Sequence, residues 1–237
     1  MSRPSAARVT VPTDAGEMPA RLWVPESGGG PGLLLLQEIF GVSAYIQRRG
    51  ADLAEAGYVV LAPELYWRLD AEPIDESQEG AIEEAMGRAQ QLDWATTVGD
   101  AVAALHALAG RDDVTGGTGV IGFCFGGGLA FNVAAVADPA VLVSYYGSAL
   151  PGLLDLAPQV TAPSLHHFGT VDAYIDLPTV ERIREAVTAG GTPVEFELYD
   201  GANHAFDNDS FMLHHQHASR TAWHRTLEFL ARELPLG

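Results

Sequence analysis

Cysteine is scarce in this chain, which has one, Cys124, among its 237 residues. A lone cysteine excludes an intramolecular disulfide and a cluster of thiolate metal ligands, and it fits a reducing compartment. Basic residues are also few: 13 lysines and arginines stand against 31 aspartates and glutamates, which gives a formal net charge of −18. This charge argues against nucleic acid and against an anionic membrane surface as binding partners.

The chain also lacks a hydrophobic run long enough to cross a membrane. Its longest apolar stretches, such as residues 33–36, are far shorter than a transmembrane helix of roughly 20 residues. Residues 1–8 contain no apolar core of a secretory signal. Hydrophobic residues still make up 47% of the chain, as in a globular domain. We therefore expect a cytoplasmic protein, a monomer or weak homodimer, folded as one domain over residues 1–237.

The most informative pattern is the pentapeptide GFCFG at residues 122–126. It follows an apolar run of β type at 118–123 and precedes a helical pattern at 129–136. Glycines on both sides of a nucleophile, between a strand and a helix, are the signature of a nucleophile elbow, whose turn is too tight for neighbouring Cβ atoms. The motif predicts that Cys124 is a nucleophile; taken alone, it also fits a buried core cysteine beside a Gly-rich turn.

Strands and helices alternate along the chain. We predict an antiparallel pair of strands at 7–11 and 19–24, further strands at 33–36, 58–61, 118–123, 141–146, 164–168 and 194–199, and helices at 43–56, 97–108, 129–136, 179–188 and 218–234. This alternation predicts a doubly wound, mostly parallel sheet with helices on both faces. Residues 70–93 are acidic and poorly patterned, so we interpret them as a solvated loop and helix, with no large lid domain.

An acid and a histidine follow the elbow at the ends of two later strands. Asp172 comes just after the strand at 164–168, and His204 just after the strand at 194–199. Reactive groups gather at the carboxyl ends of strands in open α/β sheets, and α/β-hydrolases use the order nucleophile, acid, histidine. Asp172 alone fits a helix cap and His204 alone a loop residue. Their joint placement predicts a triad with Cys124 on an α/β-hydrolase fold.

The chemistry assigns each triad member a role. Cys124 supplies a thiolate, which a nearby imidazolium and the following helix N-terminus favour. His204 takes the thiol proton and later activates water, while Asp172 orients the imidazole. The backbone N–H groups of Phe125 and Ile39 are the expected oxyanion donors.

Glu38 lies at the end of the strand at 33–36 and is expected to face the same site. A carboxylate there could take the proton of Cys124 or hold the thiol unreactive until substrate enters. The alternative is a structural glutamate paired with a backbone group or an arginine.

Five segments together resemble the dienelactone hydrolase family (carboxymethylenebutenolidases): GFCFG at 122–126, QEIFG at 37–41, APELY at 62–66, GTVD at 169–172 and HAF at 204–206. The resemblance extends over residues 7–233, and it is specific because most α/β-hydrolases carry serine at the elbow. It implies a Cys–His–Asp triad borne by Cys124, His204 and Asp172. It also implies that Glu38 interacts with the resting cysteine and takes part in its activation by substrate.

The sequence departs from the family pattern where the best-known members grip a substrate carboxylate. Asn208 replaces one arginine, and a second arginine position corresponds to Ile82. Arg68 and Tyr66 remain, with Asn208, as candidate substrate-binding residues. We therefore predict a hydrolase that cleaves a small lactone or activated ester through a thioester acyl-enzyme, with a neutral substrate rather than the carboxylate-bearing dienelactone.

Other motifs predict no cofactor. The G-x-G-x-x-G match at 117–122 overlaps a strand instead of opening a helix, as a dinucleotide site requires. The histidines at 214–217 cannot all face one side of a helix, so we interpret them as a solvated helix start and expect no metal. His166 and His167 lie within a strand, where one of them must point into the packing. The alternative function is a non-enzymatic thiol sensor in the cytoplasm, because a lone activated Cys124 could be oxidised reversibly.

Overall fold

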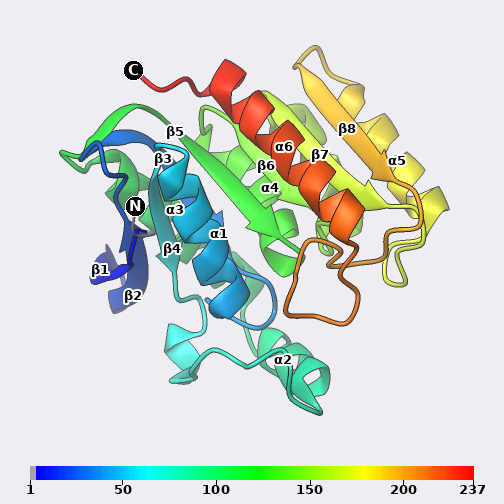
Figure 1. Ribbon diagram of the computed structural model, residues 1–237, viewed down its shortest axis with the longest axis horizontal. Helices are drawn as coiled ribbons and strands as arrows, with labels where there is room; N and C mark the ends of the chain where they lie inside the picture. Colours follow the sequence, from blue (N-terminus) through cyan, green and yellow to red (C-terminus); the bar gives the residue numbers. More distant parts are fainter. Residues whose placement is uncertain (1–3) are drawn as a thin grey trace.

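The computed structural model describes residues 4–237, in which eight strands form one sheet in the order β1-β2-β4-β3-β5-β6-β7-β8 (Figure 1). The strands are β1 (Ala7–Thr13), β2 (Gly16–Trp23), β3 (Gly30–Leu36), β4 (Val59–Pro63), β5 (Val114–Phe123), β6 (Leu142–Tyr145), β7 (Ser164–Gly169) and β8 (Val194–Tyr199). β1 pairs antiparallel with β2, and β2 with β4, while the remaining pairs are parallel. The predicted hairpin and the mostly parallel sheet are confirmed.

Helices cover both faces of the sheet. They are α1 (Ala44–Glu55), α2 (Ala81–Ala89), α3 (Trp94–Ala109), α4 (Phe125–Ala137), α5 (Leu177–Thr188) and α6 (Gln216–Glu233), with short 3-10 segments at η1 (Trp67–Leu69), η2 (Leu150–Gly152) and η3 (Leu154–Gln159). Figure 1 shows α1 and α6 in front of the sheet and α3 and α4 behind it. Every residue of β3 and β4 is buried, as expected of strands covered on both faces. Among residues 4–237, no helix has both the length and the apolar character needed to cross a bilayer.

Polar side chains fix where two of the helices begin. The carboxylate of Asp93 accepts a hydrogen bond of 2.8 Å from the backbone N–H of Thr96 at the start of α3. Asp176 accepts one of 3.0 Å from the N–H of Thr179 at the start of α5. These caps satisfy N–H groups that have no partner within the helix.

Three strands begin earlier than the sequence predicts: β2 begins at Gly16 rather than at residue 19, and β3 and β5 also begin early. β5 begins at Val114 rather than at residue 118, and β3 begins at Gly30 rather than at residue 33. These two residues are each other's partners in the sheet. Gly30 suits its place because a Cβ there would lie 2.2 Å from the carbonyl oxygen of Gly57. Such a contact between distant segments leaves no periodic pattern in the sequence.

The acidic segment 70–93 contains α2 flanked by loops, as predicted, but it is not only a solvated face. Ile74 and Ala85 are buried with Phe40 in a small apolar cluster. Glu76 is also buried. Packing against the loop after β3 overrides what the local charge pattern indicates.

The strand histidines are both buried, although we expected only one of them to point into the packing. His166 Nε2 lies 3.2 Å from Ser164 Oγ, and His167 Nδ1 lies 2.8 Å from the Tyr199 hydroxyl. Burial lowers the pKa of His166 to about 4, which keeps this ring neutral. Helices on both sides of β7 explain why neither ring reaches solvent.

Two of the ambiguous sequence motifs form parts of secondary-structure elements. The G-x-G-x-x-G match lies wholly within β5 and opens no helix. The histidine run leads into α6, where His215 Nδ1 accepts a hydrogen bond of 3.2 Å from the N–H of Ala218. This histidine therefore caps the helix, in agreement with a helix start.

The parallel register brings the carboxyl ends of distant strands to one edge of the sheet. Leu36 of β3 pairs with Gly122 of β5, and Gly169 of β7 pairs with Tyr199 of β8. The segments that follow these strands therefore converge on a common site.

Candidate active site

The turn between β5 and α4 forces Cys124 into an unusual conformation, with φ 54° and ψ −115°. Glycines make the turn possible, because a Cβ at Gly122 would lie 1.9 Å from the carbonyl oxygen of Gly126. A Cβ at Gly126 would lie 2.3 Å from the carbonyl oxygen of Leu36. A non-glycine residue with positive φ is strained, and such strain concentrates at functional sites.

The structure brings the three predicted triad residues together in one buried line. His204 Nε2 lies 3.1 Å from Cys124 Sγ, and His204 Nδ1 lies 2.8 Å from Asp172 Oδ2. The other carboxylate oxygen of Asp172 accepts hydrogen bonds from the N–H groups of Tyr174 and Ile175, at 2.8 and 2.9 Å. The carboxylate is therefore fixed from two sides while it holds the imidazole.

The electrostatics of this line favour an imidazolium. Burial by itself would lower the pKa of His204, but the charge of Cys124 and the contacts with Asp172 outweigh burial and raise this pKa to about 10. A protonated His204 lies where it would pair with a thiolate, the form in which a cysteine acts as a nucleophile.

Glu38 lies under the same site and is almost completely buried. Its carboxylate accepts hydrogen bonds from Asn208 Nδ2 at 2.7 Å and from the Tyr146 hydroxyl at 3.2 Å. Burial raises the pKa of Glu38 to about 7, and the charge of Glu76 adds to this, although Asn208 and His204 oppose it. At neutral pH Glu38 can therefore hold or release a proton.

A pocket of about 130 Å³ opens over the sulfur of Cys124. Its lining consists of Glu38, Ile39, Phe40, Ile82, Met86, Cys124, Ser148, Tyr174, His204, Ala205 and Phe211. Most of these side chains are apolar, and none of the lining residues in the described chain is an arginine or a lysine. Of the residues whose N–H groups we expect to bind an oxyanion, Ile39 lines the pocket and Phe125 begins α4 directly after Cys124.

Comparison with known proteins gives a match over most of the chain. The model of the dienelactone hydrolase family matches residues 18–234. The chain belongs to this family. A carboxymethylenebutenolidase from Pseudomonas sp. is 36% identical over 226 residues, which cover 94% of this chain and 93% of that protein. Another from Pseudomonas putida is 33% identical over 209 residues, which cover 87% of this chain and 88% of the relative.

Solved structures agree on the α/β-hydrolase fold of the family. A dienelactone hydrolase-like promiscuous phosphotriesterase from metagenomic libraries superposes with a TM-score of 0.81 at 20% identity, covering 100% of both chains. A dienelactone hydrolase from Anabaena variabilis gives a TM-score of 0.69 at 20% identity, covering 98% of this chain and 100% of that one. At 20% identity, these superpositions show a shared fold and nothing further.

Asn208 occupies the position at which the resemblance implies an arginine, and it does not line the pocket. It is fully buried, donates to Glu38, and accepts a hydrogen bond of 2.9 Å from the N–H of Ser210. The expectation that Asn208 contacts substrate is therefore corrected: the residue supports Glu38. The adjacent Asp207 also faces away, since it accepts a hydrogen bond of 2.7 Å from Arg49 Nε.

Arg68 is likewise outside the pocket, which corrects its expected role. Its guanidinium donates two hydrogen bonds to Asp100, at 2.9 and 2.7 Å, and it lines a separate hollow with Thr13. Ile82, in contrast, lines the active-site pocket. The second position of a family arginine is thus part of an apolar wall.

Tyr66 lies near the site, and its hydroxyl group is bound to the backbone. Its hydroxyl donates a hydrogen bond of 2.6 Å to the carbonyl oxygen of Ile39. Burial raises the pKa of Tyr66, and the charge of Cys124 adds to this effect. Tyr66 therefore holds the loop that carries Ile39, and its contact with substrate stays a prediction.

Two polar residues of the site lie outside the motifs that the sequence shows. Asn203 Oδ1 accepts hydrogen bonds from the N–H groups of His204 at 2.7 Å and Ala173 at 2.9 Å, and so joins the histidine loop to the acid loop. Ser148 Oγ lies 3.9 Å from Cys124 Sγ. Asn203 could have been found from its place directly before His204, because asparagine side chains commonly bond nearby backbone groups in turns.

Proposed function

We propose that this dienelactone hydrolase family member cleaves a lactone or an activated ester through a thioester acyl-enzyme on Cys124. The observation that supports the proposal is the 3.1 Å contact between Cys124 Sγ and His204 Nε2, backed by the 2.8 Å contact of Nδ1 with Asp172. An ion-paired thiolate is a strong nucleophile at neutral pH. The relatives named carboxymethylenebutenolidase support a lactone as the reacting group.

Acylation begins when the thiolate of Cys124 attacks the carbonyl carbon. A C–S bond forms, and the π electrons move to the carbonyl oxygen, whose negative charge accepts hydrogen bonds from the N–H groups of Phe125 and Ile39. When the intermediate collapses, the C–O bond breaks and the imidazolium of His204 gives its proton to the leaving oxygen. The products of this half are a thioester and an alcohol or an enol.

Deacylation uses the same residues in the reverse order of proton transfer. Neutral His204 takes a proton from water as the water oxygen attacks the thioester carbon. Collapse breaks the C–S bond and expels the thiolate of Cys124, which leaves a carboxylic acid and restores the ion pair. Asp172 keeps the imidazole in the tautomer that both halves require.

The pocket favours a neutral reacting group. Its walls are mostly apolar, Glu38 is its buried carboxylate, and neither Arg68 nor Asn208 faces it. A substrate carboxylate would lose its hydration here without gaining a cationic partner. We therefore propose that the substrate lacks the carboxylate of the dienelactone that names the family.

Steady-state kinetics on a dienelactone acid, its methyl ester and phenyl acetate test the proposal, with wild type and Cys124→Ala compared. We expect the methyl ester to exceed the acid in kcat/KM, Cys124→Ala to lose turnover, and mass spectrometry of quenched wild type to detect an acylated Cys124. Full activity in Cys124→Ala contradicts the mechanism, and a strong preference for the acid contradicts the neutral substrate. A thiol sensor without enzymatic activity predicts no turnover by wild type.

A further inference from the structure

The active-site pocket adjoins a wider hollow of about 1080 Å³ between α2 and the segment before α6. Figure 1 shows α2 beside that segment, which is drawn in orange. Ile82, Met86 and Phe211 line both the pocket and the hollow. A substrate that reacts at Cys124 can therefore extend past these apolar side chains into the hollow.

Glu76 is a buried carboxylate in the wall of this hollow. The side chain is 7% exposed, and its Oε1 has no hydrogen-bond partner among residues 4–237. Burying a carboxylate oxygen without a donor is unfavourable, and native proteins rarely leave such an atom unpaired. The wall of the hollow thus holds a carboxylate whose buried Oε1 no described donor compensates.

The basic side chain of α2, Arg88, has other partners than Glu76. Arg88 donates a hydrogen bond of 2.5 Å to Glu84 and another to the carbonyl oxygen of Glu72. Both ends of its guanidinium are therefore already bound.

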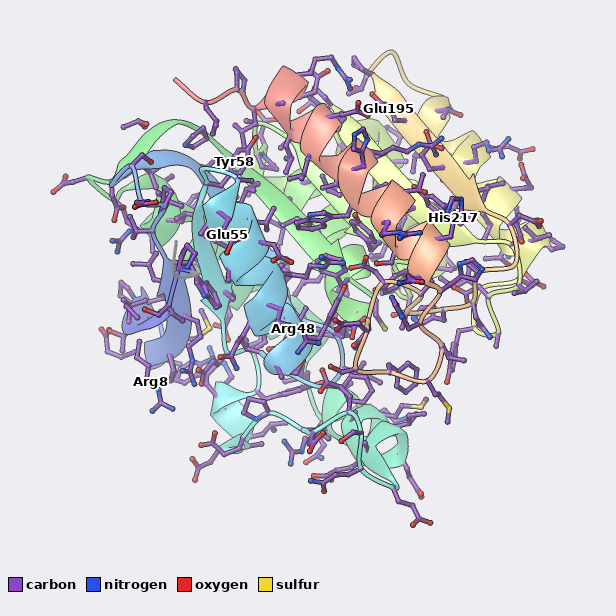
Figure 2. All side chains as sticks on the ribbon, in the orientation of Figure 1. Arg8, Arg48, Glu55, Tyr58, Glu195 and His217 are labelled. Atoms are coloured by element: carbon purple, nitrogen blue, oxygen red, sulfur yellow. The ribbon has the colours of Figure 1, made fainter. Side chains whose placement is uncertain are left out.

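Arg48, which contacts the segment before α6, is also engaged. Figure 2 shows Arg48 on α1 facing the segment before α6, where it donates 2.6 Å to Ser210 Oγ and pairs with Asp209. No arginine or lysine is among the described residues that line the hollow.

The charge of the hollow selects for a cation. Glu79 and Glu83 are exposed and line it together with Glu76. Glu76 is also close enough to Glu38 to raise the pKa of that buried carboxyl. A positive group placed at Glu76 would gain from all of these carboxylates, whereas a negative group would be repelled.

We propose that Glu76 recognises a cationic hydrogen-bond donor, an ammonium or guanidinium group, on a substrate whose apolar middle lies against Ile82, Met86 and Phe211. This inference rests on the proposed ester or lactone hydrolysis at Cys124 and specifies the class of substrate. The ester occupies the pocket, the apolar linker passes the shared wall, and the cation reaches the hollow.

Matched substrates that differ only in charge test this inference. The probes are para-nitrophenyl esters of ω-guanidinoalkanoic acids and of the isosteric, neutral ω-ureidoalkanoic acids, each in several chain lengths. At the best length, wild-type kcat/KM should favour the guanidino ester by about tenfold to a hundredfold, the range expected of a charge-assisted hydrogen bond. A wild-type ratio near one at every length overturns the inference.

Glu76→Gln should abolish most of this preference, mainly by raising KM for the guanidino ester, so that the ratio of the two kcat/KM values falls toward one. Glu83→Gln is the matched control, because it removes an equal charge from an exposed position on the same hollow. The control should keep most of the preference. An equal loss in both variants overturns a specific role for Glu76, because it assigns the preference to the general field.

A measurement on wild type alone tests the inference even if Glu76→Gln misfolds. Alkylguanidinium ions should inhibit turnover of phenyl acetate at concentrations at least about tenfold lower than the corresponding alkylureas. Equal inhibition overturns the inference. Turnover of the ureido ester that survives in Cys124→Ala overturns the proposed function instead, whereas Cys124-dependent turnover without a preference for the cation overturns only the role of Glu76.

Discussion

The side-chain amide of Asn208 donates a 2.7 Å hydrogen bond to the carboxylate of Glu38, and both residues are buried beneath the active site. The resemblance to the family implies that this glutamate interacts with the resting cysteine. Here its two oxygens accept from Asn208 and Tyr146, while Cys124 Sγ faces His204. Cys124 is thus in contact with His204, and both carboxylate oxygens of Glu38 are bound by neutral partners.

Alkylation should report the contact between Cys124 and His204 directly. An ordinary cysteine has a pKa of roughly 8.5, so only a few per cent is thiolate at pH 7. The pKa of His204 is raised to about 10, so the imidazolium should persist through neutral pH and sustain the thiolate. We expect iodoacetamide to label wild type about tenfold faster at pH 7 than His204→Ala, and the difference to narrow toward pH 9. Because Cys124 is the only cysteine, intact-mass spectrometry suffices; equal rates at pH 7 would exclude the ion pair.

The leaving group should determine which esters are hydrolysed. A thiolate, with a pKa of roughly 8.5, leaves a tetrahedral intermediate far more easily than an alkoxide, whose conjugate acid resembles water at roughly 15.7. Attack on alkyl esters therefore mostly reverses, whereas a phenolate or enolate competes. Wild type should prefer phenyl acetate to ethyl acetate strongly in kcat/KM, and Cys124→Ser should narrow the ratio. Equal wild-type values for the two esters would refute the argument.

The ionisation of Glu38 should make the free energy of unfolding depend on pH. Burial raises its pKa from the ordinary 4.5 to about 7, so the folded state holds this proton more tightly than the unfolded chain. The stability from this effect is complete below about pH 4.5 and is lost as the pH rises through 7, by an amount of about 3 kcal/mol. Glu38→Gln should therefore lose less stability between pH 5 and pH 8 in urea unfolding. Glu79→Gln, which alters an exposed carboxylate, should follow wild type, and an unaltered slope in Glu38→Gln would contradict the prediction.

Two glycine substitutions should have opposite effects. Gly126→Ala would place a Cβ 2.3 Å from the carbonyl oxygen of Leu36, so we expect loss of activity and of several kcal/mol of stability. Gly99→Ala introduces a Cβ with nothing within 4 Å on the exposed side of α3, and should stabilise by about 0.5–1 kcal/mol. Thermal unfolding of both variants checks this. A tolerated Gly126→Ala would show that the elbow can relax.

The sequence predicts the parts of the site that depend on local pattern and order. Cys124, Asp172 and His204 were found because a glycine motif and two strand ends mark them, and strand ends of a parallel sheet share one edge. The places of Arg68 and Asn208 could not be found in this way. Their partners, Asp100 and Glu38, are distant in the chain, so only the packed structure shows that neither side chain is free to meet a substrate.

The contacts of Asp207 determine how the protein should lose activity on heating. Its carboxylate binds Arg49 and Tyr45 of α1 and accepts 2.8 Å from Ser219 of α6, so the histidine-bearing segment is tied to two helices. Detaching that segment would strand a charge in the protein interior, which is costly. Loss of activity on heating should therefore coincide with the melting of the whole molecule, and amide protons around His204 should exchange with deuterium as slowly as those of the sheet.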